Sequence, residues 1–418
     1  MTSSKIKRGS QMDWKNKSVL VTGVSGFVGS YLAKYLLEQG ATVTGLIRKR
    51  ADGTKSKNIR EIEDRVRLIE GDMTDITSLA WALDISMPEV IFHLASQSFV
   101  PRSFTHRLET LQINAMGTAN LLEAIKIKDL EPVIVFAGSS EEYGLALSSE
   151  KQYREAEKKY GVIYPEPEKI PELPISEKNP LRPMSPYAVS KIQGDFLMRN
   201  YHYCYGMKTV VSRGFNQEGA GRGIMFVTSV VANQVMKLKL GEASKIVIGN
   251  VNVFRDWTHV MDTVKGYCLL AEKGKFGDVY NQGSARTNSV LSYILLSLKQ
   301  AGWDVKKVET MKNGKVIERP ADKETSEMFG VKFEMTKADK LLLQDEIGFN
   351  IEDKGIRVYT DKGIIPVEFD LSRFRPADVP ILISDTTKIK KLGFGIQHTL
   401  EDIIRDQLNY FMDKGNRG

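Results

Sequence analysis

The sequence has only two cysteines, Cys204 and Cys268, in 418 residues, and they lie far apart without the spacing of metal ligands. We therefore expect neither a disulfide framework nor a structural zinc site, no bound metal and a cytoplasmic location. No apolar run approaches the roughly 20 residues of a membrane span. The polar, basic residues 1–14 lack the apolar core of a signal peptide, so we interpret them as a flexible leader.

Clustered charge is also missing. The 59 Lys and Arg residues exceed the 52 Asp and Glu residues by seven, but they form no basic arm or stripe. Dispersed charge is typical of a solvated surface, so we expect neither nucleic acid nor a membrane as a partner. A small anionic ligand such as a nucleotide diphosphate is sufficient to explain a local positive excess.

Short apolar runs alternate with helical patterns in the first half of the chain. Fully apolar strands between helices indicate a parallel sheet covered on both faces. The pattern predicts an α/β fold with a doubly wound, Rossmann-type sheet and a smaller mixed α/β C-terminal lobe. Strands are predicted over residues 18–22, 42–47, 67–70, 89–95 and 132–137, and helices over 28–39 and 110–127.

Two segments interrupt this alternation. Residues 145–180 are charged and then proline-rich, which indicates an insertion at the edge of a cleft. A second insertion, about 318–368, is rich in charge and glycine and is expected to carry a hairpin. We expect an NADP-binding domain over 15–214 and a predominantly substrate-binding lobe over 215–418, some segments of which return to the first domain.

A glycine-rich turn joins the first predicted strand to its helix. Glycine permits a tight turn and close approach of a pyrophosphate, and the helix N-terminus favours the negative charge. The spacing is the form that short-chain dehydrogenases use. The expected cofactor contacts are Gly23, Ser25, Gly26, Phe27, Val28 and Gly29.

The end of the second strand predicts the choice of cofactor. An NAD site commonly has a carboxylate there, whereas this chain has Arg48 and Arg50, which suit a ribose 2′-phosphate. NADP is therefore favoured, and NAD is the alternative. Further cofactor contacts are expected from Asp72 and Met73 at the adenine and from Leu94, Ala95 and Ser96 along the phosphates.

Tyr187 and Lys191 form a Tyr-x-x-x-Lys pair on a predicted helix, so both lie on one face. A phenol can exchange a proton as hydride is transferred, and a neighbouring ammonium lowers the phenol's pKa and can hold the nicotinamide ribose. Ser139 or Ser140, after the strand at 132–137, can hydrogen-bond the reacting sugar oxygen. We take Ser139, Tyr187 and Lys191 as catalytic.

Glu141 adds a carboxylate that a simple dehydrogenase does not need. A 4,6-dehydratase needs one, because oxidation at C4 makes the C5 proton acidic and a base must remove it as C6 loses water. We interpret Glu141 as that base and Glu142 as a solvated neighbour. A structural role for Glu141 is the alternative.

Five ordered blocks resemble the GDP-sugar branch of the extended short-chain dehydrogenases/reductases, within the NAD-dependent epimerase/dehydratase family. They are SSEEYG, RPMSPYAVSK, FNQEGAGRGIMFVT, IGNVNVFRDW and FRPADVPILISDTTK. The GDP-mannose 4,6-dehydratases and the GDP-4-keto-6-deoxymannose reductases resemble the chain about equally. Ser139 stands where the dehydratases usually have Thr, and Gln217 where they have His.

The resemblance implies a nucleotide-sugar substrate, GDP-linked, and a homodimer or homotetramer built on helices at 110–127 and 187–205. It favours a 4,6-dehydratase, with a reductase or a 4-epimerase as alternatives and a non-catalytic nucleotide-binding protein as a remote one. It also implies substrate contacts from Gln97, Ser98, Asn216, Arg222, Asn250, Arg255 and Arg375. Forked guanidinium groups suit a diphosphate.

Overall fold

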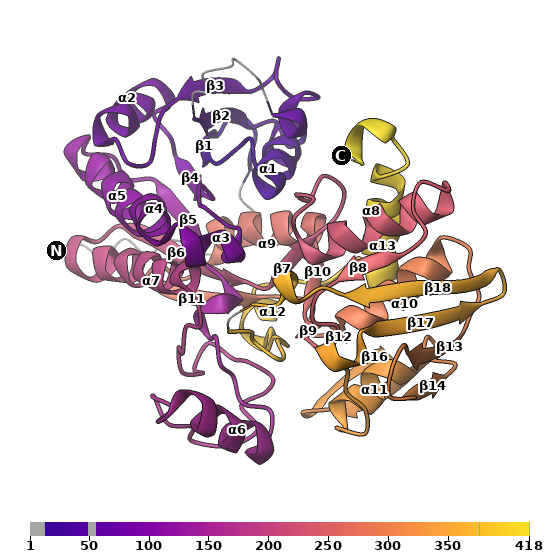
Figure 1. Ribbon diagram of the computed structural model, residues 1–418. Coiled ribbons are helices and arrows are strands. Elements are labelled where there is room, and N and C mark those ends of the chain that lie inside the picture. The colour runs from indigo at the N-terminus through magenta and orange to yellow at the C-terminus, as the bar shows by residue number, and fades with distance from the viewer. Residues whose placement is uncertain (1–12, 49–55, 376, 418) are drawn as a thin grey trace.

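The computed structural model describes residues 13–48, 56–375 and 377–417, which form two parts beside a shared cleft (Figure 1). In the first part, seven described strands form one parallel sheet in the order β11-β6-β5-β4-β1-β2-β3. The predicted Rossmann-type sheet is therefore confirmed, and its strand order reverses next to β1. The strands are β1 (Ser18–Thr22), β2 (Thr42–Ile47), β3 (Arg67–Glu70), β4 (Val90–His93), β5 (Val133–Ala137), β6 (Lys208–Gly214) and β11 (Asp278–Gln282).

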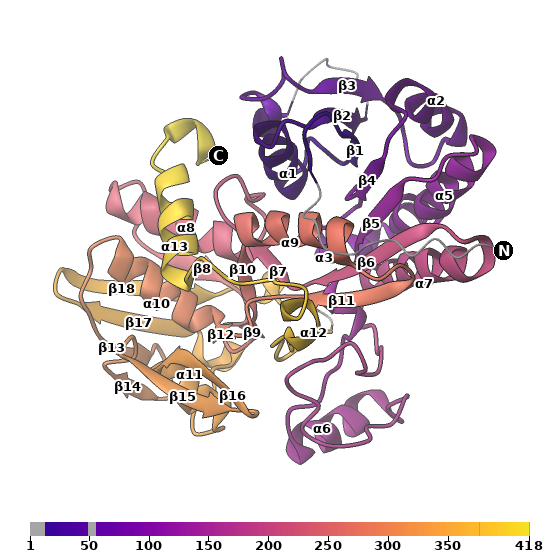
Figure 2. The ribbon, with the colours of Figure 1, turned by 180° about the vertical axis from the view of Figure 1, so that it is seen from behind.

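Helices cover both faces of this sheet (Figures 1 and 2). Successive residues of each strand point to opposite sides of the sheet, so each strand contributes side chains to the core on both faces. Val19 and Val21 belong to the core beneath α1 and α9, whereas Leu20 belongs to the core beneath α2, α5 and α7. These helices are α1 (Phe27–Glu38), α2 (Ile76–Ser86), α5 (Gly117–Ile127), α7 (Pro186–Tyr205) and α9 (Val260–Lys273).

The end of the expected leader contributes to the core. Residues 1–12 lie outside the described part of the chain. Trp14 is buried, its indole N–H donates to Glu272 Oε1 at 2.9 Å, and its ring centroid lies 6.0 Å from that of Phe92. Trp14 therefore anchors the start of the first strand.

The helix expected over 110–127 is present, but it begins earlier and contains a π-helical turn. After α3 (Val100–Thr105) and α4 (Arg107–Leu111), a π-helical turn occupies Gln112–Met116 and leads into α5. Asn114 in this turn is buried and donates to Gln97 O at 3.1 Å and to Ser190 Oγ at 2.9 Å. The wider turn directs this side chain toward α7 and the cleft edge.

The segment at residues 145–180 projects from the body and carries α6 (Glu150–Tyr160), at the lower end of the molecule in Figure 1. Its small core contains Leu145, Leu147, Ala156 and Ile163. Its return strand is held by a paired contact between Arg182 and Glu172, whose side chains are both 4% exposed. The segment therefore has a fixed structure of its own.

The second part contains the predicted mixed sheet and its helices. Five described strands run in the order β14-β13-β17-β18-β8, with β8 parallel to β18 and the others antiparallel. They are β8 (Ile246–Ile248), β13 (Val305–Thr310), β14 (Val316–Glu318), β17 (Gly355–Thr360) and β18 (Gly363–Phe369), and they pack with α8 (Val227–Lys239), α10 (Val290–Gln300) and α13 (Leu400–Tyr410).

The segment expected as the second insertion supplies the hairpin β15 (Lys323–Met328)–β16 (Val331–Thr336), then α11 (Lys337–Leu343) and the pair β17–β18. Short strand pairs β7 (Asn216–Glu218)–β10 (Trp257–His259) and β9 (Phe254–Arg255)–β12 (Asn288–Ser289) lie between the two sheets. None of the described helices is both long and apolar enough to span a bilayer.

Candidate active site

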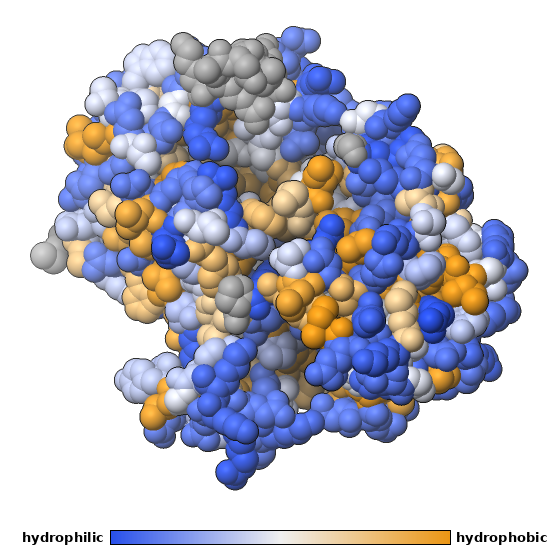
Figure 3. All heavy atoms as spheres, in the orientation of Figure 1, coloured by the Kyte–Doolittle hydropathy of each residue, from blue (hydrophilic) through white to orange (hydrophobic). Residues whose placement is uncertain are grey.

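A cleft of about 1660 Å³ lies at the carboxyl ends of the parallel strands and extends into the second part. Figure 3 shows the surface hollowed between the two parts, with hydrophobic residues around the hollow. Ligands bind at this edge of doubly wound sheets. Every site residue predicted from the sequence lines the cleft, except Arg50, which lies outside the described residues.

The glycine turn is shaped to receive a phosphate. Gly23 has φ +73°, and a Cβ on it would lie 2.9 Å from Ala95 N, while a Cβ on Gly29 would lie 2.2 Å from Gly23 O. Gly26 caps α1 without a side-chain hydrogen bond, and the first turn contains no acidic residue. The Gly26 N–H donates to Gly23 O at 2.9 Å, and the amides of the first turn of α1 that follow it are available to a pyrophosphate, as a dinucleotide requires.

Thr22 fixes the opposite wall of this cradle. Its Oγ1 accepts hydrogen bonds from Leu94 N and Ala95 N, both at 3.1 Å, and lies 2.8 Å from His93 Nδ1. Burial lowers the pKa of His93 to about 3, with a smaller contribution from Lys191, so the ring is neutral. The Oγ of Ser96 is buried without a hydrogen-bond partner and faces the same cleft.

At the outer end of the cleft, Arg48 is exposed just after β2. Asp72 Oδ1 accepts from Thr74 N at 2.8 Å and Thr74 Oγ1 at 2.7 Å, so this carboxylate already shapes its own turn. These hydrogen bonds, led by the backbone one, hold the pKa of Asp72 below its usual range, and the charge of Arg48 contributes. The adjacent Met73 is buried.

Tyr187 and Lys191 lie one turn apart near the start of α7, which begins because Ser185 accepts from Ala188 N at 3.1 Å and Pro186 opens the first turn. Lys191 Nζ donates to Ala137 O at 2.8 Å and lies 5.9 Å from the Tyr187 ring centroid. Burial lowers the pKa of Lys191 to about 8. Burial raises the pKa of Tyr187, and a hydrogen bond with Ser139 opposes this rise.

Ser139 comes directly after β5 and caps a short 3-10 turn, η3 (Ser140–Glu142). Its Oγ accepts from Glu141 N at 3.2 Å, and its own N–H donates to Glu142 Oε1 at 2.7 Å. The expectation that Glu142 is solvated is wrong, because its side chain is fully buried. Glu141, its neighbour, faces the cleft.

Arg375 crosses the cleft toward Glu141, with Nη1 3.5 Å from Glu141 Oε1. Arg255 is buried, and its guanidinium group already donates to protein acceptors, Val379 O at 2.7 Å and Asp378 Oδ1 at 3.0 Å. Arg375 is 30% exposed. Of these two predicted substrate contacts, Arg375 is therefore the more available to an anion.

Arg222 lies between the cofactor end and the second part. Its guanidinium carbon is 3.7 Å from the Phe226 ring centroid and 5.6 Å from that of Phe27 in the glycine turn. The Phe226 ring in turn meets Phe99 edge-on at 5.6 Å. Arg222 is therefore within reach of the glycine turn as well as of the second part.

The predicted amide contacts differ in availability. Asn216 Oδ1 is buried without a hydrogen-bond partner and faces the cleft, while Asn250 Oδ1 accepts from Asn252 N at 3.0 Å. Gln97 donates to Thr110 Oγ1 at 3.2 Å and accepts from Phe99 N at 2.8 Å. Gln97 therefore shapes the wall with its amide, and Ser98 lines the cleft beside it.

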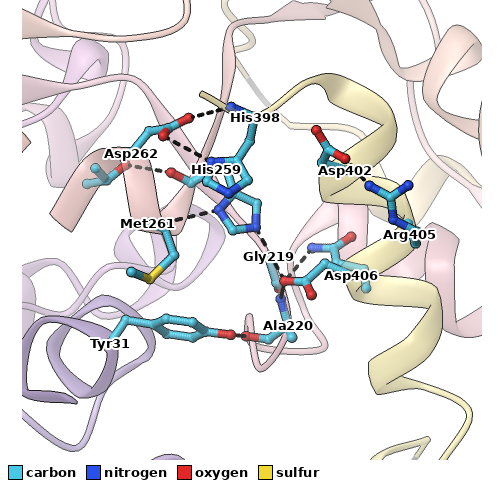
Figure 4. A network of polar contacts seen from close by, with 12 residues as sticks. Tyr31, Gly219, Ala220, His259, Met261, Asp262, His398, Asp402, Arg405 and Asp406 are labelled. Carbon is cyan, nitrogen blue, oxygen red and sulfur yellow. Dashed lines mark hydrogen bonds and ion pairs between the residues drawn. The ribbon is translucent and has the colours of Figure 1, made fainter. Parts of the chain in front are cut away.

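A polar network behind the cleft was not predicted from the sequence (Figure 4). The rings of His259 and His398 stack at 4.0 Å between centroids, and His398 Nδ1 lies 3.0 Å from Asp262 Oδ1. Asp406 on α13 lies 3.4 Å from His259 Nε2 and accepts from Ala220 N at 3.1 Å. This network holds the loop that carries Arg222.

No three His, Cys, Asp or Glu side chains are grouped as metal ligands within residues 13–48, 56–375 and 377–417. The site is instead a nucleotide-sized cleft with a phosphate cradle at one end and a Ser, Tyr, Lys and Glu group at its centre. This arrangement is typical of the class of Rossmann-fold enzymes that use a dinucleotide cofactor.

The chain belongs to the NAD dependent epimerase/dehydratase family, whose model matches residues 19–283. GDP-mannose 4,6-dehydratases are among its relatives. The one from Sinorhizobium fredii is 29% identical over 408 residues, covering 94% of this chain and 97% of the relative. The one from Vibrio cholerae is 30% identical and covers 94% and 93%.

Solved structures share the fold. RMD from Pseudomonas aeruginosa, complexed with NADPH, has a TM-score of 0.63 at 22% identity and covers 94% of this chain and 99% of its own. UDP-glucose 4-epimerase from Bifidobacterium longum, in complex with NAD+ and UDP, has a TM-score of 0.67 at 22% identity and covers 96% and 99%.

Proposed function

We propose that this protein is a nucleotide-sugar 4,6-dehydratase of the GDP-mannose type, which converts a nucleoside diphosphate hexose to its 4-keto-6-deoxy form. The observation that carries the proposal is Glu141, whose carboxylate lines the same cleft as Ser139, Tyr187 and Lys191. A base beside the proton-transfer centre is needed for elimination and not for simple hydride transfer. The GDP-mannose 4,6-dehydratases that match over 94% of the chain support this choice.

The cradle at Gly23–Gly29 fits a dinucleotide cofactor, and Arg48 favours NADP because it can pair with a 2′-phosphate. We infer that residues 15–214 bind the cofactor and that residues 215–418 predominantly bind the substrate. The glycine turn and Lys191 would hold the nicotinamide cofactor, which would supply reversible hydride chemistry between C4 and C6 without net consumption. Asn216, Arg222 and Arg375 are the substrate contacts best placed to hold the nucleotide.

The chain's own groups manage the protons. Tyr187 accepts the proton of the C4 hydroxyl, and Ser139 Oγ hydrogen-bonds that oxygen. Burial raises the pKa of Tyr187, whereas the hydrogen bond with Ser139 and the positive charge of Arg222 lower it, so the phenolate depends on these two groups. Glu141 then removes the C5 proton, which the C4 ketone has made acidic, and delivers it to the C6 hydroxyl, which leaves as water. After hydride addition at C6, the Tyr187 phenol supplies the proton that restores the C5–H bond.

We also propose a homodimer formed through the face of α4, α5 and α7. This face exposes Leu108 and Tyr203, which are 74% and 72% exposed, together with Met116 and Phe196. An apolar patch of this kind is typical of a protein–protein contact. Light scattering on the wild type and on Phe196→Glu tests it, and a monomeric wild type rejects it.

Incubation with GDP-mannose and catalytic NADP+ tests the activity, with the product followed by mass spectrometry. We expect loss of one water, abolished in Glu141→Gln and in Tyr187→Phe. An unchanged hexose with the wild type rejects the dehydratase for this substrate. Reduction of a 4-keto sugar with stoichiometric NADPH would instead identify a reductase.

A further inference from the structure

Glu142 lies behind the proposed catalytic serine and points away from the cleft. Its side chain is fully buried, and Oε1 accepts the Ser139 N–H at 2.7 Å. Glu141, next in the chain, faces the cleft from the same short turn. The backbone that positions Ser139 therefore depends on a carboxyl group to which the proposed reaction gives no role.

The other carboxylate oxygen of Glu142 lies near Arg213, whose guanidinium group also contacts a second carboxylate. Arg213 Nε lies 3.2 Å from Glu142 Oε2 and donates to Asp195 Oδ2 at 2.8 Å. One N–H cannot satisfy two carboxylates fully, and Asp195 also accepts from Arg199 Nε at 2.6 Å. Glu142 Oε2 is buried without a hydrogen bond. Glu142 and Asp195 both contact the same nitrogen, Arg213 Nε. A proton on Glu142 Oε2 would let this oxygen donate a hydrogen bond to the Asp195 carboxylate.

The charges around Glu142 favour that proton. Burial raises the pKa of Glu142 to about 8, the negative charge of Asp195 adds to the rise, and Arg213 opposes it. Lys191 and Tyr187 face the group from α7. On β6, Arg213 Nη1 also donates to the Tyr143 hydroxyl at 3.1 Å, and burial together with the negative charge of Glu177 raises the pKa of Tyr143.

We propose that Glu142 is a positioning residue that shares one proton with Asp195 across Arg213 and holds the Ser139 backbone in line with Tyr187. As a neutral acid it donates to Asp195 through Oε2 and accepts from Ser139 through Oε1. The catalytic consequence rests on the proposed function, whereas the shared proton is a property of the folded chain alone.

The neutral form of Glu142 matters because of its effect on the Tyr187 phenol. A negative charge on Glu142 disfavours the Tyr187 phenolate, as the charge of Glu141 already does. An acid that keeps its proton near neutral pH supplies the hydrogen bond to Ser139 without that penalty. Two like charges at one buried site separate their protonation in this way.

Three variants separate charge, hydrogen bonding and packing. Glu142→Gln keeps a donor toward Asp195 and an acceptor toward Ser139 but has no proton to lose. Glu142→Leu removes both hydrogen bonds. Asp195→Asn is the matched control, because it relieves the competition for Arg213 and leaves the contact between Glu142 and Ser139 in place.

Infrared spectroscopy and unfolding test the shared proton without any turnover. We expect the carbonyl band of a buried protonated carboxyl in the wild type, and its loss in both Glu142→Gln and Asp195→Asn. Since the folded protein holds this proton between pH 4.5 and about 8 and the unfolded chain does not, wild-type stability falls as pH rises through that window. The unfolding constant of the wild type relative to Glu142→Gln should rise by up to about tenfold per pH unit.

Kinetics test the positioning role. Glu142→Leu should lower kcat by about 100-fold or more with KM nearly unchanged. Glu142→Gln should lose much less, and its kcat should decline less steeply above about pH 8 than that of the wild type, because only Lys191 then titrates in this range. A band and a pH slope that persist in Glu142→Gln overturn the shared proton. Equal kcat in the Leu and Gln variants overturns the positioning of Ser139. A wild type without dehydratase activity rejects only the proposed function, and the infrared and unfolding results still decide the proton.

Discussion

The carboxylate of Glu141 and the guanidinium of Arg375 are 3.5 Å apart, and they reach the cleft from different parts of the chain. The contact is long for a charge-assisted hydrogen bond, and Arg375 is partly exposed. A diphosphate entering the cleft would therefore compete with Glu141 for Arg375. Substrate binding would then release the carboxylate for proton transfer.

Replacing Glu141 by Gln should separate elimination from oxidation. We expect dehydration to slow by about 10²- to 10⁴-fold, because the C5 proton loses its acceptor, while the hydroxyl chemistry at Tyr187 remains. Reduced nicotinamide should then accumulate in a single turnover, which absorbance measures.

Glu109→Gln is the control for this variant, since Glu109 also lines the cleft but pairs with Arg102 at 2.9 Å near its mouth. We expect it to dehydrate at nearly the wild-type rate. A Glu141→Gln enzyme that still releases water at the wild-type rate excludes Glu141 as the base.

The buried charge of Lys191 should lower the free energy of unfolding, although the proposed reaction needs this side chain. Its pKa falls from 10.5 to about 8 because of burial, a penalty on the order of 3 kcal/mol on the charged form. The penalty is fully present below pH 8 and disappears as pH rises toward 10.5, where folded and unfolded states are both neutral.

Lys191→Met should therefore unfold at higher denaturant concentration than the wild type at neutral pH and lose the stability gain between pH 8 and 10.5. Its activity should be lost. Lys158→Met, on the exposed side of α6, should leave the denaturation midpoint unchanged. A Lys191→Met protein less stable than the wild type at neutral pH contradicts the argument.

Arg48 should set the choice between NADP and NAD. The Arg48→Glu variant removes a charge-assisted contact to the 2′-phosphate and adds a carboxylate that suits a 2′-hydroxyl. We expect the ratio of the NADP and NAD dissociation constants to change about 100-fold. Calorimetric titration with NADP+ and NAD+ measures this ratio. Arg65→Glu, an exposed arginine away from the cleft, should leave the ratio as it is.

The local pattern was enough to predict β1 to β5, since fully apolar runs between helices depend only on neighbouring residues, but it did not predict β6 or β11. Pairings over long distances were not predictable in this way. Ile246 in β8 lies beside Val367 in β18 only because the intervening chain folds back. The π-helical turn within the helix at 110–127 likewise depends on Asn114 meeting Gln97 and Ser190, which its own segment does not reveal.

Motif spacing and the family resemblance together predicted residues that line the cleft, but not which way adjacent side chains point. In a 3-10 turn, neighbouring residues project about 120° apart, so Glu141 faces the cleft and Glu142 the core. His259 stacks on His398, which lies far away in the sequence. Only His259 comes shortly after one of the five family-like blocks, IGNVNVFRDW. Such contacts are set by tertiary packing.

The buried pair of Glu172 and Arg182 should hold the projecting segment together. Glu172→Ala leaves an unpaired buried cation and should destabilise the segment by about 3–5 kcal/mol. Limited proteolysis should then cut within residues 145–180 first, while the double variant Glu172→Leu with Arg182→Met resists more strongly. Equal resistance of the single variant and the wild type would show that the pair contributes little.

The edge position of β11 has a consequence for how the protein is made. This strand pairs with β6 although it follows β7, α8 and β10 in the chain. On the ribosome, β6 therefore waits with an open hydrogen-bonding edge until residue 282 has emerged, and an unpaired edge invites other chains. A fragment ending near residue 214 would keep that edge permanently. We expect the nucleotide-binding sheet to be completed during synthesis only once much of the second part has been translated.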